Sequence, residues 1–175
     1  MSTQIDGVRS ASQAESPISP GFATSPQMAD CLQRVLVDLI ALTLNVKQAH
    51  WNVVGPNFRG THLLLDEIVD AVQDYTDTIA ERMRALSLVP DGRPMTVVES
   101  TSLADFPSGE RNTTEVVGQI TDRIRRAVVT VRAVHDQVDA EDPSTTDLLH
   151  TVIGGLEKYA WLLYAETAAV GNSAG

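Results

Sequence analysis

The residues of this sequence that could do chemistry are histidines and carboxylates on one face of a predicted helix over residues 58–88. At about 100° per residue, four of them fall within an arc of roughly 100°. Imidazole and carboxylate groups together suit iron, manganese or zinc, so the stripe is a candidate metal site. His50, at the end of the preceding predicted helix, is a fifth candidate ligand. The stripe consists of His62, Asp66, Asp77 and Glu81, with Asp70 inside it.

A solvent-exposed charged helix face would also explain these carboxylates. Histidine is scarce, however, with four in the chain, and His50 and His62 lie close together in the sequence beside the carboxylates. The stripe also lacks the alternating Lys and Arg that an exposed helix face normally carries. These two features favour metal ligation, although residue types alone leave both interpretations open.

Spacing along the helix indicates a site shared between two chains. His62 and Asp77 are separated by about 22 Å along a helix that rises 1.5 Å per residue. One metal centre cannot contact both side chains of the same chain. A two-fold partner whose second helix runs antiparallel would bring its Asp77 and Glu81 to His62 and Asp66 of the first chain. We therefore expect two equivalent sites per dimer, as an isologous interface requires.

Carboxylate-rich sites in helical bundles are typical of iron chemistry. A site with oxygen ligands and open coordination positions would bind Fe²⁺ weakly, stabilise Fe³⁺ and leave room for an oxidant. Trp51 directly follows His50 and could pack over the site and scavenge an oxidising equivalent, but simple interface packing explains it equally well. A zinc or manganese hydrolase with the same ligand types is the rival enzyme class.

Four helices are predicted to position these residues, which makes the fold class all-α. The chain of 175 residues is 43% apolar but only 5% aromatic, a balance that suits a helical bundle. Residues 1–25 are rich in Ser, Gly, Pro, Ala and Gln and are predicted to be a flexible N-terminal tail. Residues 26–171 are predicted to be the bundle domain.

Start and stop signals bound the predicted helices. The first is expected over residues 26–51, after the capping pair Ser25-Pro26, and the second over residues 58–88. The third begins at a capping box, Asn112-Thr113-Thr114-Glu115, and the fourth begins at Asp142-Pro143.

The segment 89–112 carries several prolines and glycines and is predicted to be a long crossover with a short helical turn near residues 97–103. Such a connection can carry the chain along the bundle, as parallel neighbouring helices would require. Gly154-Gly155 inside the fourth helix costs roughly 2 kcal/mol of helix propensity. We expect the pair to allow close approach of a neighbouring helix, from this chain or from another subunit.

The formal net charge of -10 favours cations over nucleic acid as partners. Cys31 is the one cysteine, so no disulfide can form within the chain, which is typical of a reducing cytosol. The sequence has neither a secretory signal pattern nor an uninterrupted apolar run of about 18 residues, so no membrane span is predicted. We expect a cytoplasmic protein.

The residues around the candidate ligands resemble the signature of the Dps family (DNA-binding protein from starved cells) of the ferritin-like superfamily. The resemblance covers about residues 26–170. It is specific, because it fixes five ligands at set offsets together with their flanking residues. The matching positions are His50-Trp51-Asn52-Val53-Val54-Gly55, Phe58, His62, Asp66, Asp77 and Ala80-Glu81-Arg82.

The resemblance implies a ferritin-like four-helix subunit in a hollow dodecamer, with ferroxidase centres between two-fold-related subunits. His50, His62 and Asp66 would come from one chain, and Asp77 and Glu81 from the other. A pair of irons at each site would be oxidised from Fe²⁺ by hydrogen peroxide or O₂, and ferric mineral would be stored inside. This oxidoreductase activity would protect bacterial DNA during starvation and oxidative stress.

An acidic run near the start of the fourth helix is implied to line three-fold pores that admit iron. Three copies of several carboxylates would concentrate cations at a pore mouth. A polar loop in which Asp142 caps the helix is the alternative. His135 and His150 do not match the ligand pattern and are interpreted as structural or surface residues, with a place near a pore open to His150. The run consists of Asp139, Glu141, Asp142 and Asp147.

Direct DNA binding is where this sequence departs from the family's name. Many members bind through a Lys-rich tail, whereas residues 1–25 carry one arginine, two acidic residues and no lysine. Because phosphate contacts need Lys or Arg, we do not expect tight binding unless metal ions bridge or surface arginines cluster. A nucleoid-compacting protein with weak ferroxidase activity remains the alternative function. The arginines in question are Arg123, Arg125, Arg126 and Arg132.

Overall fold

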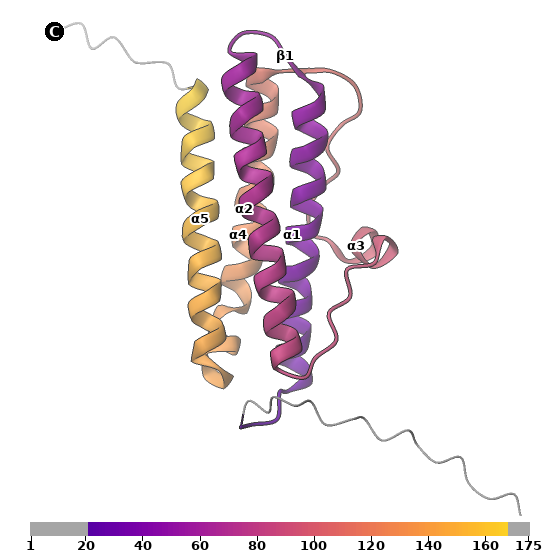
Figure 1. The fold of residues 1–175 in the computed structure, drawn as a ribbon, viewed down its shortest axis with the longest axis vertical. Helices are drawn as coiled ribbons and strands as arrows, with labels where there is room; N and C mark the ends of the chain where they lie inside the picture. The colour runs from indigo at the N-terminus through magenta and orange to yellow at the C-terminus, as the bar shows by residue number, and fades with distance from the viewer. Residues whose placement is uncertain (1–20, 168–175) are drawn as a thin grey trace, which may run out of the picture.

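The computed structural model describes residues 21–167. Four long helices form a bundle, and a short helix lies on the connection between the second and third of them (Figure 1). The all-α prediction is confirmed. Most of the predicted tail, and residues 168–171 of the predicted domain, lie outside the described residues. The elements are α1 (Pro26–Asn52), β1 (Val53–Val54), α2 (Phe58–Ala85), α3 (Pro94–Ser100), β2 (Arg111–Asn112), α4 (Thr113–Glu141) and α5 (Pro143–Thr167).

The start of α1 is capped as its sequence predicts. The backbone N–H of Met28 donates to Ser25 Oγ over 3.1 Å, and Pro26 takes the first helical position, where no N–H is needed. The backbone N–H and the hydroxyl of Ser25 both donate to the Glu141 carboxylate over 2.6 Å. The beginning of α1 is therefore fastened to the end of α4.

The boundaries of α2 and α4 follow from local backbone chemistry. α2 ends at Ala85, earlier than the predicted residue 88, because Ser87 adopts a left-handed backbone conformation with φ of 64°. α4 begins at the predicted capping box, where the backbone N–H of Glu115 donates to Asn112 Oδ1 over 2.9 Å. These contacts fix where each helix starts or stops, independently of the core.

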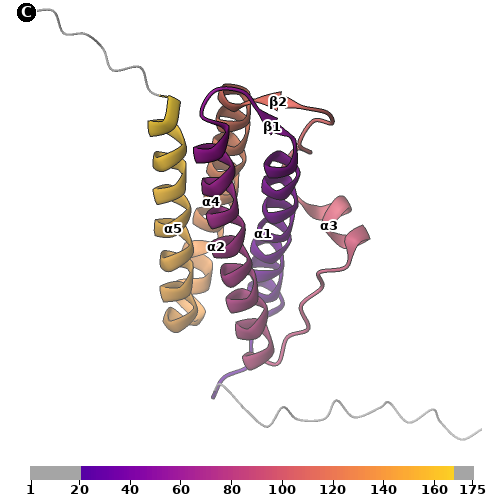
Figure 2. The same ribbon diagram turned by 45° about the horizontal axis from the view of Figure 1, so that its top comes forward.

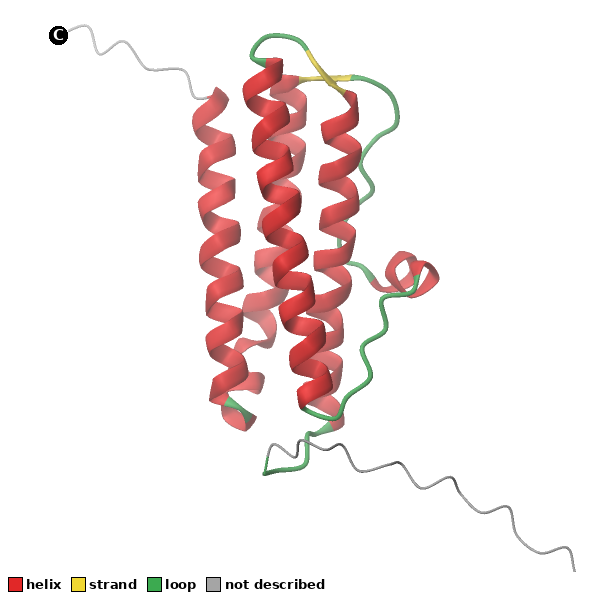
Figure 3. Ribbon diagram, viewed as in Figure 1, coloured by secondary structure: helices red, strands yellow, loops and turns green. Residues whose placement is uncertain are grey.

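Neighbouring helices in the bundle are antiparallel. α1 packs against α2 and α4, and α5 packs against α4 and α2 (Figures 1 and 2). The crossover does carry the chain back along the bundle, but the expectation of parallel neighbours is wrong. α2 and α4 run parallel yet lie diagonally opposite and barely touch. At the end where α1 turns into α2, β1 pairs in parallel with β2, which places the start of α4 beside that turn (Figure 3).

The crossover is fastened to the bundle by a buried carboxylate on α1. Asp38, 3% exposed, accepts hydrogen bonds from the hydroxyls of Thr101 and Thr130 and from the backbone N–H and hydroxyl of Ser102, over 2.6 to 2.9 Å. The helical turn that was predicted near residues 97–103 is α3, which begins three residues earlier, at Pro94. One buried carboxylate thus accepts hydrogen bonds from the backbone and hydroxyls that follow α3.

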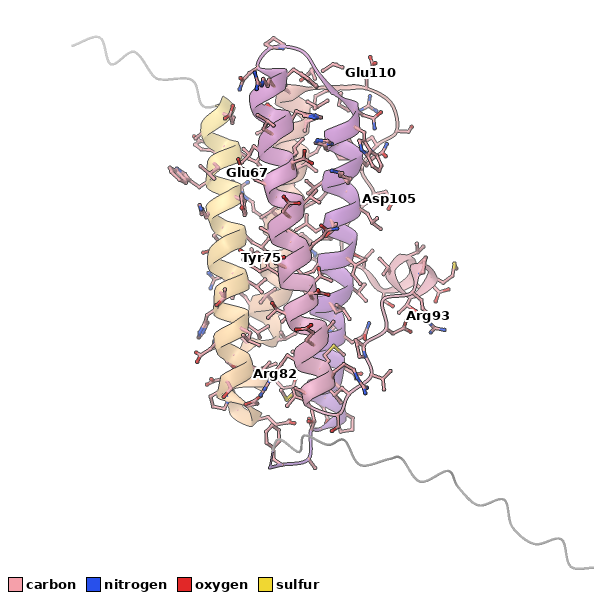
Figure 4. The ribbon with its side chains drawn as sticks, in the orientation of Figure 1. Glu67, Tyr75, Arg82, Arg93, Asp105 and Glu110 are labelled. Carbon is pink, nitrogen blue, oxygen red and sulfur yellow. The ribbon has the colours of Figure 1, made fainter. Side chains whose placement is uncertain are left out.

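The core lies between the four long helices and is filled mainly by Leu, Val and Ile side chains. At Gly155 the close helix approach that the sequence predicted is confirmed, because a Cβ there would lie 1.9 Å from the Tyr75 hydroxyl on α2 (Figure 4). Gly154 has no such neighbour within the described chain. Over residues 21–167, none of the helices is both long and apolar enough to cross a membrane.

Candidate metal centre

The turn between α1 and α2 brings three of the predicted ligands together. α1 ends at Asn52 and α2 starts at Phe58, so the last turn of α1 lies beside the first turns of α2. His50, His62 and Asp66 each offer a ligand atom, and these atoms lie within 4.8 Å of one another. We call these three residues the His–His–Asp cluster. Its members share an end of the bundle because the connection is so short.

The two imidazole rings are stacked, with centroids 3.7 Å apart and planes 23° apart. Nδ1 of His62 lies 3.1 Å from the backbone oxygen of His50, which can only accept a hydrogen bond. Nδ1 of His62 therefore carries the proton, and Nε2 keeps a lone pair for a metal ion. Such outer hydrogen bonds commonly fix the tautomer of metal-binding histidines. The ring of Phe58 packs against the other side, 5.0 Å from His62.

His50 is buried and polar but poorly satisfied. Its side chain is 9% exposed, and neither ring nitrogen makes a hydrogen bond within the described chain, although Nε2 lies 3.0 Å from Asp66 Oδ2. That contact is close enough for an ion pair but lacks hydrogen-bond alignment. Burial lowers the pKa of His50 below 6.5, and it outweighs the opposing effect of Asp66. The ring is therefore neutral at pH 7, as a metal ligand must be.

A lysine competes for the carboxylate of the cluster. Lys47 Nζ lies 2.7 Å from Asp66 Oδ1, and this hydrogen bond is the main reason that the pKa of Asp66 is lowered. Asp66 is therefore ionised at neutral pH, with one oxygen toward Lys47 and the other toward His50. The sequence carried a signal for Lys47, because it lies three residues before His50 and so shares its helix face. It was not recognised as part of the site.

The cluster supplies two nitrogen donors and one carboxylate, which is fewer than a closed metal site requires. Iron, zinc and manganese all accept such donors, and a three-ligand set leaves positions open for further ligands or a reactant. Imidazole nitrogens beside the ionised Asp66 carboxylate fit a divalent cation. The arrangement is one that can hold a metal ion while leaving it accessible.

The remaining two predicted ligands do not join the cluster in one chain. Asp77 and Glu81 are exposed further along α2. Asp77 lines a surface hollow of about 450 Å³ between α1 and α2, together with Ile40, Thr43, Leu44, Gln73, Asp74 and Thr76. Leu44 beside it is 62% exposed. Within the described residues of one chain, the cluster therefore lies at one end of α2 and the two exposed carboxylates lie toward the other.

Trp51 points into a different hollow from the cluster. It is 68% exposed and borders a groove of about 390 Å³ between α1 and the crossover, which Val97 and Phe106 also line. The predicted role of Trp51 over the metal stays a prediction, because a side chain this exposed would need a second copy of the chain to cover it.

Two residues of the acidic run make hydrogen bonds or ion pairs with other elements, and the other two are exposed. Asp142 is 6% exposed and is paired with Arg82, while Glu141 holds Ser25 at the start of α1. Asp139 and Asp147 are exposed. The capping alternative for Asp142 agrees with its contacts, since the backbone N–H of Thr145 donates to the Asp142 carbonyl. The pore role stays a prediction, and Asp139 and Asp147 are the members free to face a channel.

Two other residue groups have contacts that the sequence did not indicate. His135 on α4 and His150 on α5 face each other, with their Nε2 atoms 2.8 Å apart. Arg123, one of the arginines considered for DNA, instead donates to the carbonyls of Ala104 and Asp105 and lies 5.5 Å over the Phe106 ring. Its guanidinium is used to hold the crossover.

Comparison with known proteins supports the ferritin-like fold. Residues 29–169 match the ferritin-like domain family. The chain is 36% identical over 148 residues to the fine tangled pili major subunit of Haemophilus ducreyi, covering 83% of this chain and 78% of that one. It is 34% identical over 156 residues to the DNA protection during starvation protein of Mycolicibacterium smegmatis, covering 87% and 85%.

Among solved structures, Dps from Microbacterium arborescens, in a high iron form, matches with a TM-score of 0.77 at 38% identity. The match covers 85% of this chain and 99% of that one. The names of these proteins range from a pilus subunit to a DNA-protecting protein. What the present chain does must therefore be argued from its own site residues.

Proposed function

This chain belongs to the Dps family of the ferritin-like superfamily, and we propose that it is a ferroxidase that oxidises and stores iron. The observation that carries the proposal is the His–His–Asp cluster, in which the buried His50 ring lies beside the Asp66 carboxylate without an aligned hydrogen bond. An unsatisfied buried imidazole is costly unless something binds it. Fe²⁺ is the substrate that suits mixed imidazole and carboxylate donors in a helical bundle. The high iron form of the Microbacterium relative supports the same choice.

The reaction needs two electrons for each hydrogen peroxide. Two Fe²⁺ ions each lose one electron, the O–O bond breaks, and two protons complete two water molecules, leaving two Fe³⁺ ions. O₂ is the alternative oxidant. Paired oxidation releases no hydroxyl radical, so DNA would be protected by chemistry, as the name of the Mycolicibacterium relative suggests for that protein. The net charge of -10 favours this route over direct DNA binding.

The site is proposed to form between two copies of the chain. A partner with antiparallel α2 would add its Asp77 and Glu81 to the cluster, completing a site for two irons. Two features support this arrangement: both carboxylates are exposed, and Leu44 leaves apolar surface uncovered in the hollow that Asp77 lines. Exposed apolar patches of this kind commonly mark subunit interfaces. We propose further assembly into a hollow cytoplasmic dodecamer that holds ferric mineral.

The first test is anaerobic loading with Fe²⁺ followed by hydrogen peroxide, tracking ferric absorbance and residual peroxide. Wild-type protein should consume peroxide quickly at about two Fe²⁺ per peroxide, and His62→Ala should react no faster than free iron. Glu67→Gln is the matched control, because Glu67 neighbours Asp66 in sequence but lies toward α5 (Figure 4). A wild-type rate equal to that of free iron, or an unimpaired His62→Ala variant, contradicts the proposal. Hydrolytic activity that depends on zinc would instead favour the alternative that the protein is a metal-dependent hydrolase.

A mixing experiment tests the shared site separately. His62→Ala chains lose one ligand of the His–His–Asp cluster but keep Asp77 and Glu81. Asp77→Ala chains keep the cluster but lose one of the two carboxylates. After unfolding and refolding together in equal amounts, half of the dimers are mixed, and each mixed dimer has one intact site. About a quarter of wild-type activity should therefore return. If the mixture stays as inactive as its components, the site does not combine these residues across two chains.

A further inference from the structure

A second pair of histidines lies away from the His–His–Asp cluster. His135 is in the second half of α4 and His150 is in the first half of α5, toward the opposite end of the bundle from the turn between α1 and α2 (Figure 1). The two Nε2 atoms are 2.8 Å apart, and the ring centroids are 5.0 Å apart at 35°. The two rings therefore point their outermost nitrogens at a common position.

The other nitrogen of each ring faces a carboxylate. His135 Nδ1 lies 2.8 Å from Asp136 Oδ1, and His150 Nδ1 lies 3.7 Å from Asp147 Oδ1. An ionised carboxylate only accepts hydrogen bonds, so Asp136 favours the form of His135 with the proton on Nδ1. Asp147, 3.7 Å from His150 Nδ1, is too far for a hydrogen bond and contributes only negative charge beside that ring. A carboxylate behind a histidine is the usual outer support of a metal-binding imidazole.

A divalent cation suits this arrangement. With the Nδ1 proton of His135 directed to Asp136, its Nε2 lone pair points at Nε2 of His150, where a proton on His150 can fill the position as a hydrogen bond. A metal ion in place of that proton would be bound by both rings while Asp136 keeps its hydrogen bond. The Asp147 carboxylate, 3.7 Å from His150, adds negative charge that favours a cation.

We infer that His135 and His150 form a second metal site, which binds a divalent transition-metal ion of the class that prefers imidazole, such as Zn²⁺ or Co²⁺. Zn–N bonds of about 2.0–2.1 Å at a tetrahedral angle separate two nitrogens by about 3.3 Å. The present separation must open by about half an ångström. His150 can provide this movement, because its side chain is 56% exposed.

The surroundings leave space for the other ligands. The pair borders a surface hollow of about 390 Å³, which Ile153 and Gly154 also line, and no atom of residues 21–167 lies within 4 Å of a Cβ built at Gly154. Arg132, the nearby cation, is engaged by Glu157 over 2.6 Å. Water can complete the coordination from this side. Two imidazoles with water ligands make an exchangeable site rather than a closed structural one.

The test uses the full-length, iron-free protein and Zn²⁺ as the probe. Equilibrium dialysis should show that His150→Gln and His135→Gln each lose about one bound Zn²⁺ per chain, while peroxide consumption with Fe²⁺ and particle size stay unchanged. His62→Gln is the comparison, because it should remove zinc from the His–His–Asp cluster and leave this site filled. The combined variant His62→Gln with His150→Gln should lose both.

A crystal of the wild-type protein soaked in Zn²⁺ needs no variant. Anomalous scattering at the zinc edge should give a peak between the two Nε2 atoms. No peak there at a zinc concentration that fills the His–His–Asp cluster would overturn the inference. Unchanged zinc binding by both glutamine variants would overturn it as well.

Discussion

Lys47 Nζ lies 2.7 Å from Asp66 Oδ1, so an ammonium group sits where a second cation would approach the carboxylate of the cluster. The other oxygen of Asp66 faces His50 Nε2 at 3.0 Å. The Asp66 carboxylate therefore has one oxygen beside the Lys47 ammonium and the other beside the His50 ring. Any iron that binds through Oδ1 must displace the lysine or accept its repulsion.

Replacing Lys47 by Met should tighten metal binding. The side chains of Lys47 and Asp66 are 34% and 41% exposed, so the repulsion between ammonium and metal is partly screened, and we expect an increase in Zn²⁺ affinity of about tenfold. Isothermal titration of the iron-free protein would measure it. Lys158→Met is the matched control, since it removes the other lysine, on α5. An affinity equal to wild type would mean that Lys47 does not compete with the metal.

Local signals predicted the starts of α1 and α4 well because each of these carries its own capping chemistry. Ser25 and Asn112 accept the backbone hydrogen bonds that the sequence indicated. The end of α2 was missed because a left-handed serine, Ser87, has no distinctive signal. The β1–β2 pairing was missed for another reason, since a two-residue strand joins segments far apart in the chain.

The candidate site was predicted only as far as one chain can determine it. Helical periodicity places His62 and Asp66 on one face, and the short turn brings His50 to them. The ammonium of Lys47 and the pairing of His135 with His150 depend on how separate helices pack, which spacing within one helix does not reveal. The position of Asp77 relative to the cluster depends on a second copy, and stays a prediction.

Asp38 should be the most sensitive polar residue of the bundle. Asp38→Asn would replace one carboxylate oxygen by an NH₂ group that faces two of the four donors, leaving buried hydrogen bonds unmade. We expect a loss of about 2–3 kcal/mol of unfolding free energy, measured by urea denaturation, and faster proteolysis of the crossover. Asp30→Asn, at an exposed position of the same helix, is the control. Equal midpoints for the two variants would show that Asp38 does not anchor the crossover.

Gly154 and Gly155 should respond in opposite ways to alanine. A Cβ at residue 155 would lie 1.9 Å from the Tyr75 hydroxyl, so Gly155→Ala must displace the ring and should cost about 1–3 kcal/mol. Gly154→Ala meets nothing within 4 Å and should gain up to about 1 kcal/mol of helix propensity. Thermal unfolding would compare them. Destabilisation by Gly154→Ala would contradict this and indicate that another subunit covers that face.

The ion pair between Arg82 and Asp142 joins the end of α2 to the start of α5 and should make stability depend on acid (Figure 4). Burial alone would raise the pKa of Asp142, but hydrogen bonds from Thr145 and Arg82 outweigh burial and lower it. A carboxyl whose pKa is lower in the folded state contributes stability above the unfolded pKa of about 4. That contribution is lost as the pH falls through the folded pKa.

Arg82→Met should therefore lower the unfolding free energy at pH 7 by about 1–3 kcal/mol, because it leaves a buried carboxylate with fewer partners. Below about pH 4 the difference from wild type should shrink, since protonation removes the charge that Arg82 balances. Urea unfolding at a series of pH values would measure this. Arg84→Met is the control, because Arg84 is exposed on the same helix and bonds to the Leu88 carbonyl. A difference that stays constant from pH 7 to pH 3 would show that Arg82 acts through packing rather than through its charge.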